Sequence, residues 1–259
     1  MSDQAPAPGP MFWSNLWLNV LGGFLAAVAY ALFIWAIRVS QRIVRKRRAR
    51  NFFGNDALGG SHELVFSEFE LRADCLDPEK SPEFPYRKPG EVHYMMKTSR
   101  VLPLCDARAI GYLASSLGQI SGKTAPVVSD ESIQQRLNVS FVSLGLGANH
   151  KTRDLLSNSA NQFFAFDFES NKLSLAGKDI VVKGGFDYGV IAKIIPQQFP
   201  HRVWIACAGL GEWGTSGAAW FLANKWTELY ATASKQPFAA LIRVNAGKDE
   251  SAHLEQIVT

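Results

Sequence analysis

Residues 203–220 read VWIACAGLGEWGTSGAAW, and this stretch decides the fold class. The apolar run Val203–Ala208 predicts a buried strand, because it is short and is followed at once by glycines. Gly209-Leu210-Gly211 then makes a tight turn, and the apolar stripe that follows predicts a long helix over 214–233. A buried strand that passes through glycines directly into a helix is typical of α/β proteins.

The same order of elements occurs earlier in the chain. Val139–Leu144 predicts a buried strand, Gly145-Leu146-Gly147 a turn, and Asn149 the N-cap of a helix. Asp106 is the expected cap of a helix over 106–117, and another helix is expected from Glu131. The alternation predicts a Rossmann-like three-layer α/β domain with a mostly parallel sheet, made mixed by a hairpin over 163–175. The remaining expected strands are 63–71, 125–129, 188–195 and 238–244, the last closing the series.

Gly209, Gly211 and Gly214 satisfy the pattern GxGxxG, which in dinucleotide-binding proteins brings a pyrophosphate against a helix N-terminus. Three features weaken that interpretation. The motif lies late in the chain, the next strand ends without an acidic residue, and bulky Trp213 precedes the third glycine. NAD binding is therefore only weakly supported. An unspecified anion or nucleotide, or glycines that merely make tight turns, are the alternatives.

The carboxyl ends of parallel strands and the helix N-termini beside them are where α/β sheets bind ligands, and free N–H groups there favour anions. If the strands before the two Gly-Leu-Gly loops are parallel neighbours, the loops border one site. The sequence thus predicts a small anionic ligand, for which a nucleotide-derived molecule is one candidate. It identifies no cofactor. The candidate ligand-binding residues are Gly145, Gly147, Asn149, Gly209, Gly211, Glu212, Gly214, Thr215 and Ser216.

Catalysis and metal binding have little support in the sequence, and no catalytic or metal-binding residue is assigned. The five histidines are scattered, and the three cysteines show no CxxC spacing. Gly118–Thr124 resembles a P-loop but has one residue too few between its glycines and is followed by proline. Glu212 is the first candidate if a reaction occurs, and Asp187 is either a general base or a turn residue.

A charge boundary marks the N-terminal region. No Asp, Glu, Lys or Arg occurs over 4–37, whereas Arg38–Arg50 contains seven basic residues. The apolar run over 12–39 is long enough to span a bilayer, and its charge follows rather than precedes it, which argues against a cleaved signal peptide. Basic clusters stay in the cytoplasm, so the N-terminus is expected outside. The expected parts are an outer segment 1–11, a transmembrane helix 12–39, a basic juxtamembrane segment and flexible Gly-rich linker 40–61, and a cytoplasmic domain 62–259.

The expected partners follow from this organisation. The basic residues of Arg38–Arg50 suit anionic lipid headgroups. Gly23, Ala27 and Ala31 form a small-residue face that suits a homo-oligomer of membrane helices. Removing the seven basic residues and Asp3 leaves 20 Lys and Arg against 22 Asp and Glu over 51–259, so nucleic acid is an unlikely partner.

These features favour a membrane-anchored cytoplasmic sensor or effector that binds a small anion at its glycine loops and signals through association of its membrane helix. Two alternatives remain open. One is an anchored nucleotide- or NAD-dependent enzyme, which needs a titratable group facing the site. The other is a recruitment module at the inner membrane that has no ligand.

Overall fold

The computed structural model describes residues 10–70, 100–167, 169–170, 172–180 and 184–259, and the chain divides into two compact units, 1–47 and 48–259. Expectations that fall on 1–9 and on 71–99, which include Cys75, lie outside the described residues. Most of α1 (Pro10–Phe53) belongs to the first unit, and its residues 48–53 belong to the second.

Helix α1 is the one helix in the described part of the chain that is long and apolar enough to cross a membrane. Its large apolar side chains are not used in packing: Phe24, Leu32 and Trp35 are each more than half exposed. A buried core helix would hide such side chains, so this exposure is consistent with a hydrocarbon environment.

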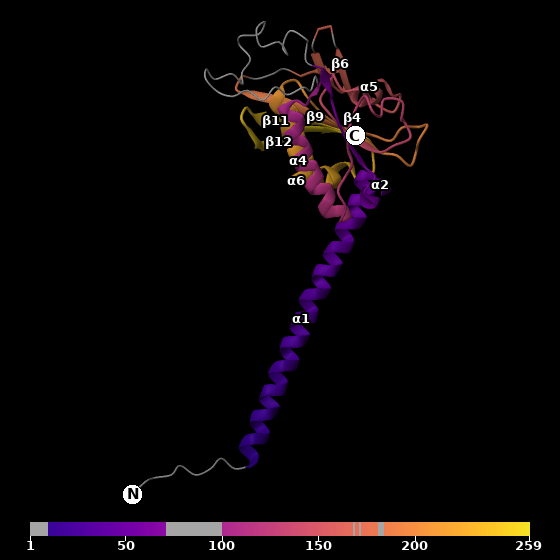
Figure 1. Cartoon of the computed structure of the whole chain (residues 1–259). Helices are drawn as coiled ribbons and strands as arrows, with labels where there is room; N and C mark the ends of the chain where they lie inside the picture. Colours follow the sequence, from indigo (N-terminus) through magenta and orange to yellow (C-terminus); the bar gives the residue numbers. More distant parts are fainter. Residues whose placement is uncertain (1–9, 71–99, 168, 171, 181–183) are drawn as a thin grey trace, which may run out of the picture. The chain divides into compact units, whose positions relative to one another are not determined.

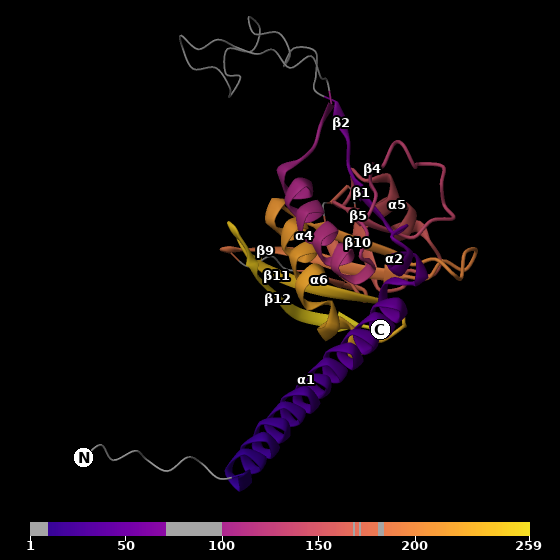
Figure 2. The same ribbon diagram turned by 60° about the horizontal axis from the view of Figure 1, so that its bottom comes forward.

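The second unit is a mixed α/β domain built on a seven-stranded sheet of order β12-β11-β9-β10-β5-β1-β4 (Figures 1 and 2). Strands β4, β1, β5 and β10 pair in parallel, and β9, β11 and β12 extend the sheet by antiparallel pairing. The expected mostly parallel sheet is confirmed, because β11 runs in the same direction as the four parallel strands. The bounds are β1 (Glu63–Phe66), β4 (Val127–Ser129), β5 (Phe141–Leu144), β9 (Phe186–Ile194), β10 (Trp204–Gly209), β11 (Phe238–Asn245) and β12 (Lys248–Val258).

Alternating side chains bury both faces of the sheet. Along β10, Ile205 and Cys207 point to one core, whereas Trp204 and Ala206 point to the other. The first core lies under α4 (Leu104–Ser121) and α6 (Glu212–Ala233), which pack side by side (Figure 2). The second lies under α5 (His150–Ser157) and a separate sheet of β6 (Phe164–Asp167), β7 (Lys172–Leu175) and β8 (Lys178–Asp179).

The flexible Gly-rich linker that was expected in the later part of 40–61, over residues 51–61, is wrong. Phe52 and Phe53 end α1 and are buried against Trp226 of α6, and α2 (Asn55–Gly59) follows with Ala57 buried. These two phenylalanines and Ala57 belong to the main apolar core. The compact unit therefore begins at residue 48 rather than at 62.

Four further expectations need correction. The hairpin over 163–175 forms, but it lies in the small sheet, so the main sheet is mixed because of β9 and β12 instead. The expected helix from Glu131 is a series of turns. The strand expected over 63–71 divides into β1 and β2 (Phe69–Glu70), which pairs with β3 (Arg100–Val101). The series does not close at β11, because β12 follows it as the longest strand among the described residues.

Candidate functional site

The loops after β5 and β10 do lie together. The two strands are parallel neighbours, and the Gly145 N–H donates to the Cys207 carbonyl at 3.0 Å. Both loops therefore stand at the carboxyl edge of the parallel strands, the location that α/β sheets use for ligands. Helices α4 and α6 begin at the same edge, since the first turn of α4 is bonded to the backbone after β1 and α6 follows β10.

The glycines after β10 are required by backbone packing. A Cβ on Gly209 would lie 2.1 Å from the Thr215 nitrogen, and one on Gly214 would lie 2.2 Å from the Tyr188 carbonyl oxygen. The first turn of α6 thus sits directly on β9 and β10, and only glycine permits this approach. Gly217 is less tightly enclosed, because its Cβ would meet the buried Val244 side chain at 2.9 Å.

An internal carboxylate caps α6. Asp187, from the start of β9, accepts a hydrogen bond from the Gly214 N–H at 2.7 Å and another from the Tyr188 N–H at 2.7 Å. The same carboxylate lies 2.5 Å from where a Cβ of Gly211 would be. The Gly214 N–H, which the sequence predicts as a donor to a ligand anion, is therefore hydrogen-bonded to Asp187 instead. Asp187 is neither a free base nor a simple turn residue.

Thr215 and Asn149 are also engaged internally. Thr215 Oγ1 accepts from the Gly209 N–H at 3.0 Å. Asn149 is confirmed as the N-cap of α5, accepting from Lys151 N–H, while its amide group donates to the Val65 and Leu144 carbonyls at 3.0 and 2.9 Å. Both amide hydrogens are thereby used to join β1 to β5, which leaves the Asn149 side chain no donor for a ligand.

The remaining candidates of the first loop differ in their surroundings. Gly145 has φ +88°, a left-handed conformation that favours glycine, and a Cβ there would meet the Ser67 hydroxyl at 3.4 Å. The Gly147 carbonyl accepts from Arg153 Nε at 2.5 Å.

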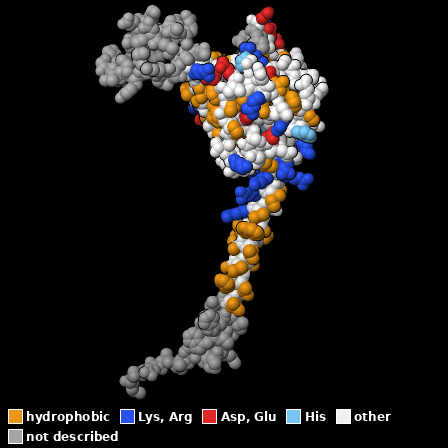
Figure 3. All heavy atoms as spheres, turned by 45° about the vertical axis from the view of Figure 1, so that its right-hand side comes forward, with side chains coloured by type: hydrophobic (Ala, Val, Ile, Leu, Met, Phe, Trp, Pro, Cys, Tyr) orange, Lys and Arg blue, Asp and Glu red, His pale blue; other side chains and the backbone are white. Residues whose placement is uncertain are grey.

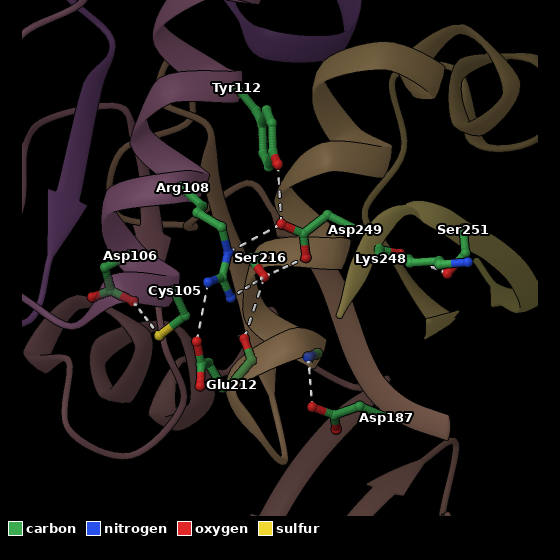
Figure 4. Close-up of polar contacts among 11 residues, drawn as sticks. Cys105, Asp106, Arg108, Tyr112, Asp187, Glu212, Ser216, Lys248, Asp249 and Ser251 are labelled. Atoms are coloured by element: carbon green, nitrogen blue, oxygen red, sulfur yellow. Dashed lines mark hydrogen bonds and ion pairs between the residues drawn. The ribbon is translucent and has the colours of Figure 1, made fainter. Parts of the chain in front are cut away.

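The side chains of Glu212 and Ser216 belong to a polar cluster between α4 and α6 (Figure 4). At its centre is Arg108 of α4, whose guanidinium donates to Glu212 Oε1 at 3.0 Å and to Ser216 Oγ at 3.2 Å. Arg108 Nε also lies 3.2 Å from Asp249 Oδ2. The guanidinium carbon stands 4.1 Å from the centre of the Trp213 ring, a cation–π contact that holds its plane. We call Arg108, Tyr112, Glu212, Trp213, Ser216 and Asp249 the Arg108 cluster.

The two carboxylates of the Arg108 cluster are in unequal environments. Asp249, from the start of β12, has a side chain only 2% exposed and receives hydrogen bonds from Ser216 Oγ at 2.5 Å and Tyr112 OH at 3.0 Å. Glu212 is 49% exposed, and Arg108 itself is 20% exposed. Asp249 is therefore a fixed part of the fold, whereas the pair with Glu212 is partly solvated and contributes little to stability.

A second polar group lies at the same edge, beside β1. The buried Asp106 accepts from the Ser67 N–H at 3.2 Å and lies 3.5 Å from the Cys105 sulfur, and its burial raises its pKa. Burial, and then the negative charge of Asp106, raise the pKa of Cys105 to about 12. Cys105 is thus a protonated thiol at neutral pH rather than a nucleophile. The expectation that Asp106 caps its helix is wrong, because α4 has Pro103 at its N-cap.

Asp130 is held in a similar manner, accepting from the Glu68 and His150 N–H groups at 3.2 and 2.9 Å. Asp130 and Asp187 thus both bind backbone N–H groups, whereas Glu212, the first candidate for a reaction, is half exposed at this edge. Within the described ranges, no group of three or more His, Cys, Asp or Glu side chains is placed to hold a metal ion.

Sequence reasoning missed Arg108, Tyr112 and the structural part played by Asp249. One signal was available: Arg108 is the only charged residue over 107–122, a stretch that is otherwise mostly apolar or small. A lone arginine in such a helix needs buried acceptors, which the sequence does not locate. No protein-family model, curated protein or solved structure matches this chain.

Proposed function

We propose that this protein is a single-pass membrane-anchored sensor or effector whose α/β domain binds a small anionic, nucleotide-type ligand at the Arg108 cluster. The observation that carries the proposal is the pairing of Arg108 with the half-exposed Glu212 at the carboxyl edge, directly after the second glycine loop. The domain would use this edge as Rossmann-like folds do.

Arg108 is prepared to bind an anion. Trp213 fixes the plane of the guanidinium and Asp249 holds its Nε side, so the group loses little freedom when a ligand arrives. Glu212 is a weakly held counterion that a phosphate or carboxylate can replace, because the pair is partly solvated. The bidentate geometry of guanidinium suits both of these ligand groups.

Helix α6 connects the proposed site to the anchor. Its first turn carries Glu212, and further along the helix Trp226 packs against Phe52 with ring centres 5.8 Å apart. Tyr230 OH accepts from Asn51 at 3.2 Å. A ligand that displaces Glu212 acts on one end of a helix whose other end contacts the last residues of α1, which is the arrangement a sensor needs.

The membrane part of the proposal rests on the sequence of α1. The basic run Arg38–Arg50 supports a cytoplasmic domain and an outer N-terminus by the positive-inside rule, and it would contact anionic lipid headgroups. The Gly23, Ala27 and Ala31 face would associate with a second copy. Ligand binding would then shift the association of the anchors.

The test is titration calorimetry of the full-length protein in nanodiscs against inorganic phosphate, nucleoside mono- and diphosphates and dinucleotides. Arg108→Gln removes charged hydrogen bonds and should weaken binding by about tenfold or more. Glu212→Gln removes the competing counterion and should tighten it. Arg243→Gln is the matched control, because Arg243 also pairs with a glutamate, Glu255 at 2.9 Å, and stacks on an aromatic ring, away from the Arg108 cluster.

Two results would contradict the proposal. One is a folded protein that binds none of these anions. The other is a ligand whose affinity is unchanged by Arg108→Gln, which would place binding elsewhere. A ligand that requires Glu212 and is chemically altered during the titration would instead favour the enzyme alternative.

A further inference from the structure

The edge of the sheet opposite the Arg108 cluster is where α1 enters the domain. Phe53 contacts His62, just before β1, and Phe52 contacts Phe238 at the start of β11, with ring centres 6.3 and 5.7 Å apart. Gly54 lies against Val203, just before β10. Residues 48–53 therefore pack where the parallel strands begin.

Exposed cations surround this entry point. Arg48 and Arg50 flank the buried Ala49, Lys235 follows the end of α6, and Lys123 follows the end of α4. We call Arg48, Arg50, Lys123 and Lys235 the basic edge. Figure 3 shows that the apolar side chains of α1 give way to Lys and Arg side chains toward its C-terminal end.

Contacts between elements bring these cations into one surface. Asn51 and Ser234 lower the pKa of Tyr230 by hydrogen bonding, and the charges of Arg48 and Lys235 lower it further, so both cations lie near this hydroxyl. Lys123 Nζ donates to the Gly59 carbonyl at 3.3 Å, which holds it beside α2. The surface is thus built from α1, α2 and the C-terminal ends of α4 and α6.

The acidic residues at this edge are already neutralised. Asp56 pairs with Arg202 at 2.8 Å and Glu63 pairs with Arg136 at 2.6 Å. In the described part of the chain, by contrast, none of the four residues of the basic edge has an acidic partner. An uncompensated positive surface attracts anions, and the attraction is strongest within a Debye length of about 8–10 Å.

We propose that the basic edge lies against an anionic lipid surface, so that the domain itself, and not only the run before it, contacts the membrane. The inference rests on the proposed membrane anchoring. Residues 40–47, which separate the apolar run from Arg48, are helical and rise only about 12 Å. The entry point is therefore held within reach of the headgroups, which leaves the Arg108 cluster, at the opposite edge of the domain, for soluble ligands.

Lysine footprinting of the full-length protein tests this contact. The protein is placed in nanodiscs of phosphatidylcholine, with or without phosphatidylserine, and labelled with a water-soluble acetylating reagent. Lys178 and Lys248 are exposed residues of β8 and β12 away from the basic edge and serve as control sites in the same sample. We expect phosphatidylserine to slow labelling of Lys123 and Lys235 but not of Lys178 and Lys248, and high salt to abolish the difference.

Lys123→Glu should weaken the phosphatidylserine dependence of labelling at Lys235, and Lys235→Glu should weaken it at Lys123, whereas Lys178→Glu should change neither. Equal labelling of Lys123 and Lys235 in both lipids, with the protein still in the nanodisc, overturns the basic-edge contact and leaves the anchor intact. A protein that separates from nanodiscs in high salt overturns the anchoring proposal and this inference together.

Discussion

Lys193 of β9 offers the sharpest test of the packing between α1 and the domain. Its side chain is fully buried, and its ammonium group lies 4.8 Å from the centre of the Phe52 ring. The ammonium donates to the Lys235 and Ser234 carbonyls at 3.2 and 3.4 Å, at the C-terminal end of α6. Burial lowers the pKa of Lys193 to about 7. The informative perturbation is Lys193→Met, which keeps the side-chain length and removes the titrating group.

The sign of the pH effect follows from proton binding. The ordinary pKa of lysine is 10.5, so between pH 7 and 10.5 the unfolded chain binds more protons at this residue than the native protein does. The free energy of unfolding therefore rises with pH by about 1.4 kcal/mol per unit in this window. The full penalty, about 5 kcal/mol, is present at and below pH 7 and disappears as the pH rises toward 10.5. The Lys193→Met variant would carry no such dependence.

The observable is the difference between the wild-type and Lys193→Met proteins, because other groups titrate in the same range. Thermal unfolding of full-length protein in detergent, followed by tryptophan fluorescence, should show the wild type gaining about 3 kcal/mol on the variant between pH 7.5 and 9.5. For a domain of this size that is roughly 6–12 °C in Tm. Lys225→Met, at a half-exposed lysine of α6 paired with Glu228, is the matched control. Parallel pH curves for the wild type and Lys193→Met would refute the reasoning.

Three further outcomes are expected in the same unfolding assay. Gly217→Ala should destabilise the protein by about 1–3 kcal/mol through overpacking. Gly111→Ala, at a helix position with open space, should stabilise it by about 0.5–1 kcal/mol. Equal effects of the two substitutions would contradict the close packing of α6. Asp187→Ala should lower stability by about 0.5–2 kcal/mol through loss of a helix cap, and an unchanged Tm would show that the cap contributes nothing. Deleting residues 1–47 should leave a cooperatively melting domain, whereas deleting 1–61 removes two buried phenylalanines and should not; the reverse would refute the observed boundary.

Much of the domain could be predicted because strong local signals agreed with burial. The apolar strands β5 and β10, the Asn149 cap and the long helix α6 all follow from short stretches of sequence. The glycines and asparagines of residues 51–61 indicate a flexible linker, but the adjacent Phe52 and Phe53 indicate a buried segment. The two aromatic side chains are the better guide, because both are buried in the core.

The direction of β9 was harder to predict, although its connection held a clue. Only residues 195–203 join β9 to β10, and they include Pro196 and Pro200. A parallel crossover needs a dozen or more residues, so this connection suits antiparallel strands. Strand β12 escaped prediction because its outer positions carry charged and polar residues, as is usual at a sheet edge.

The antiparallel placement of β9 gives the glycine loop a neighbour that an all-parallel dinucleotide-binding sheet does not have. In an all-parallel sheet, the neighbouring strands start at the edge away from the glycine loops, and only their carboxyl ends lie beside a ligand. Here β9 starts at the carboxyl edge of β10, so Asp187 reaches the first turn of α6 and binds the Gly214 N–H. The protein thereby supplies its own anion on the β9 side of the loop. The ligand anion that we propose would bind on the other side of the loop, where Arg108 pairs with the half-exposed Glu212.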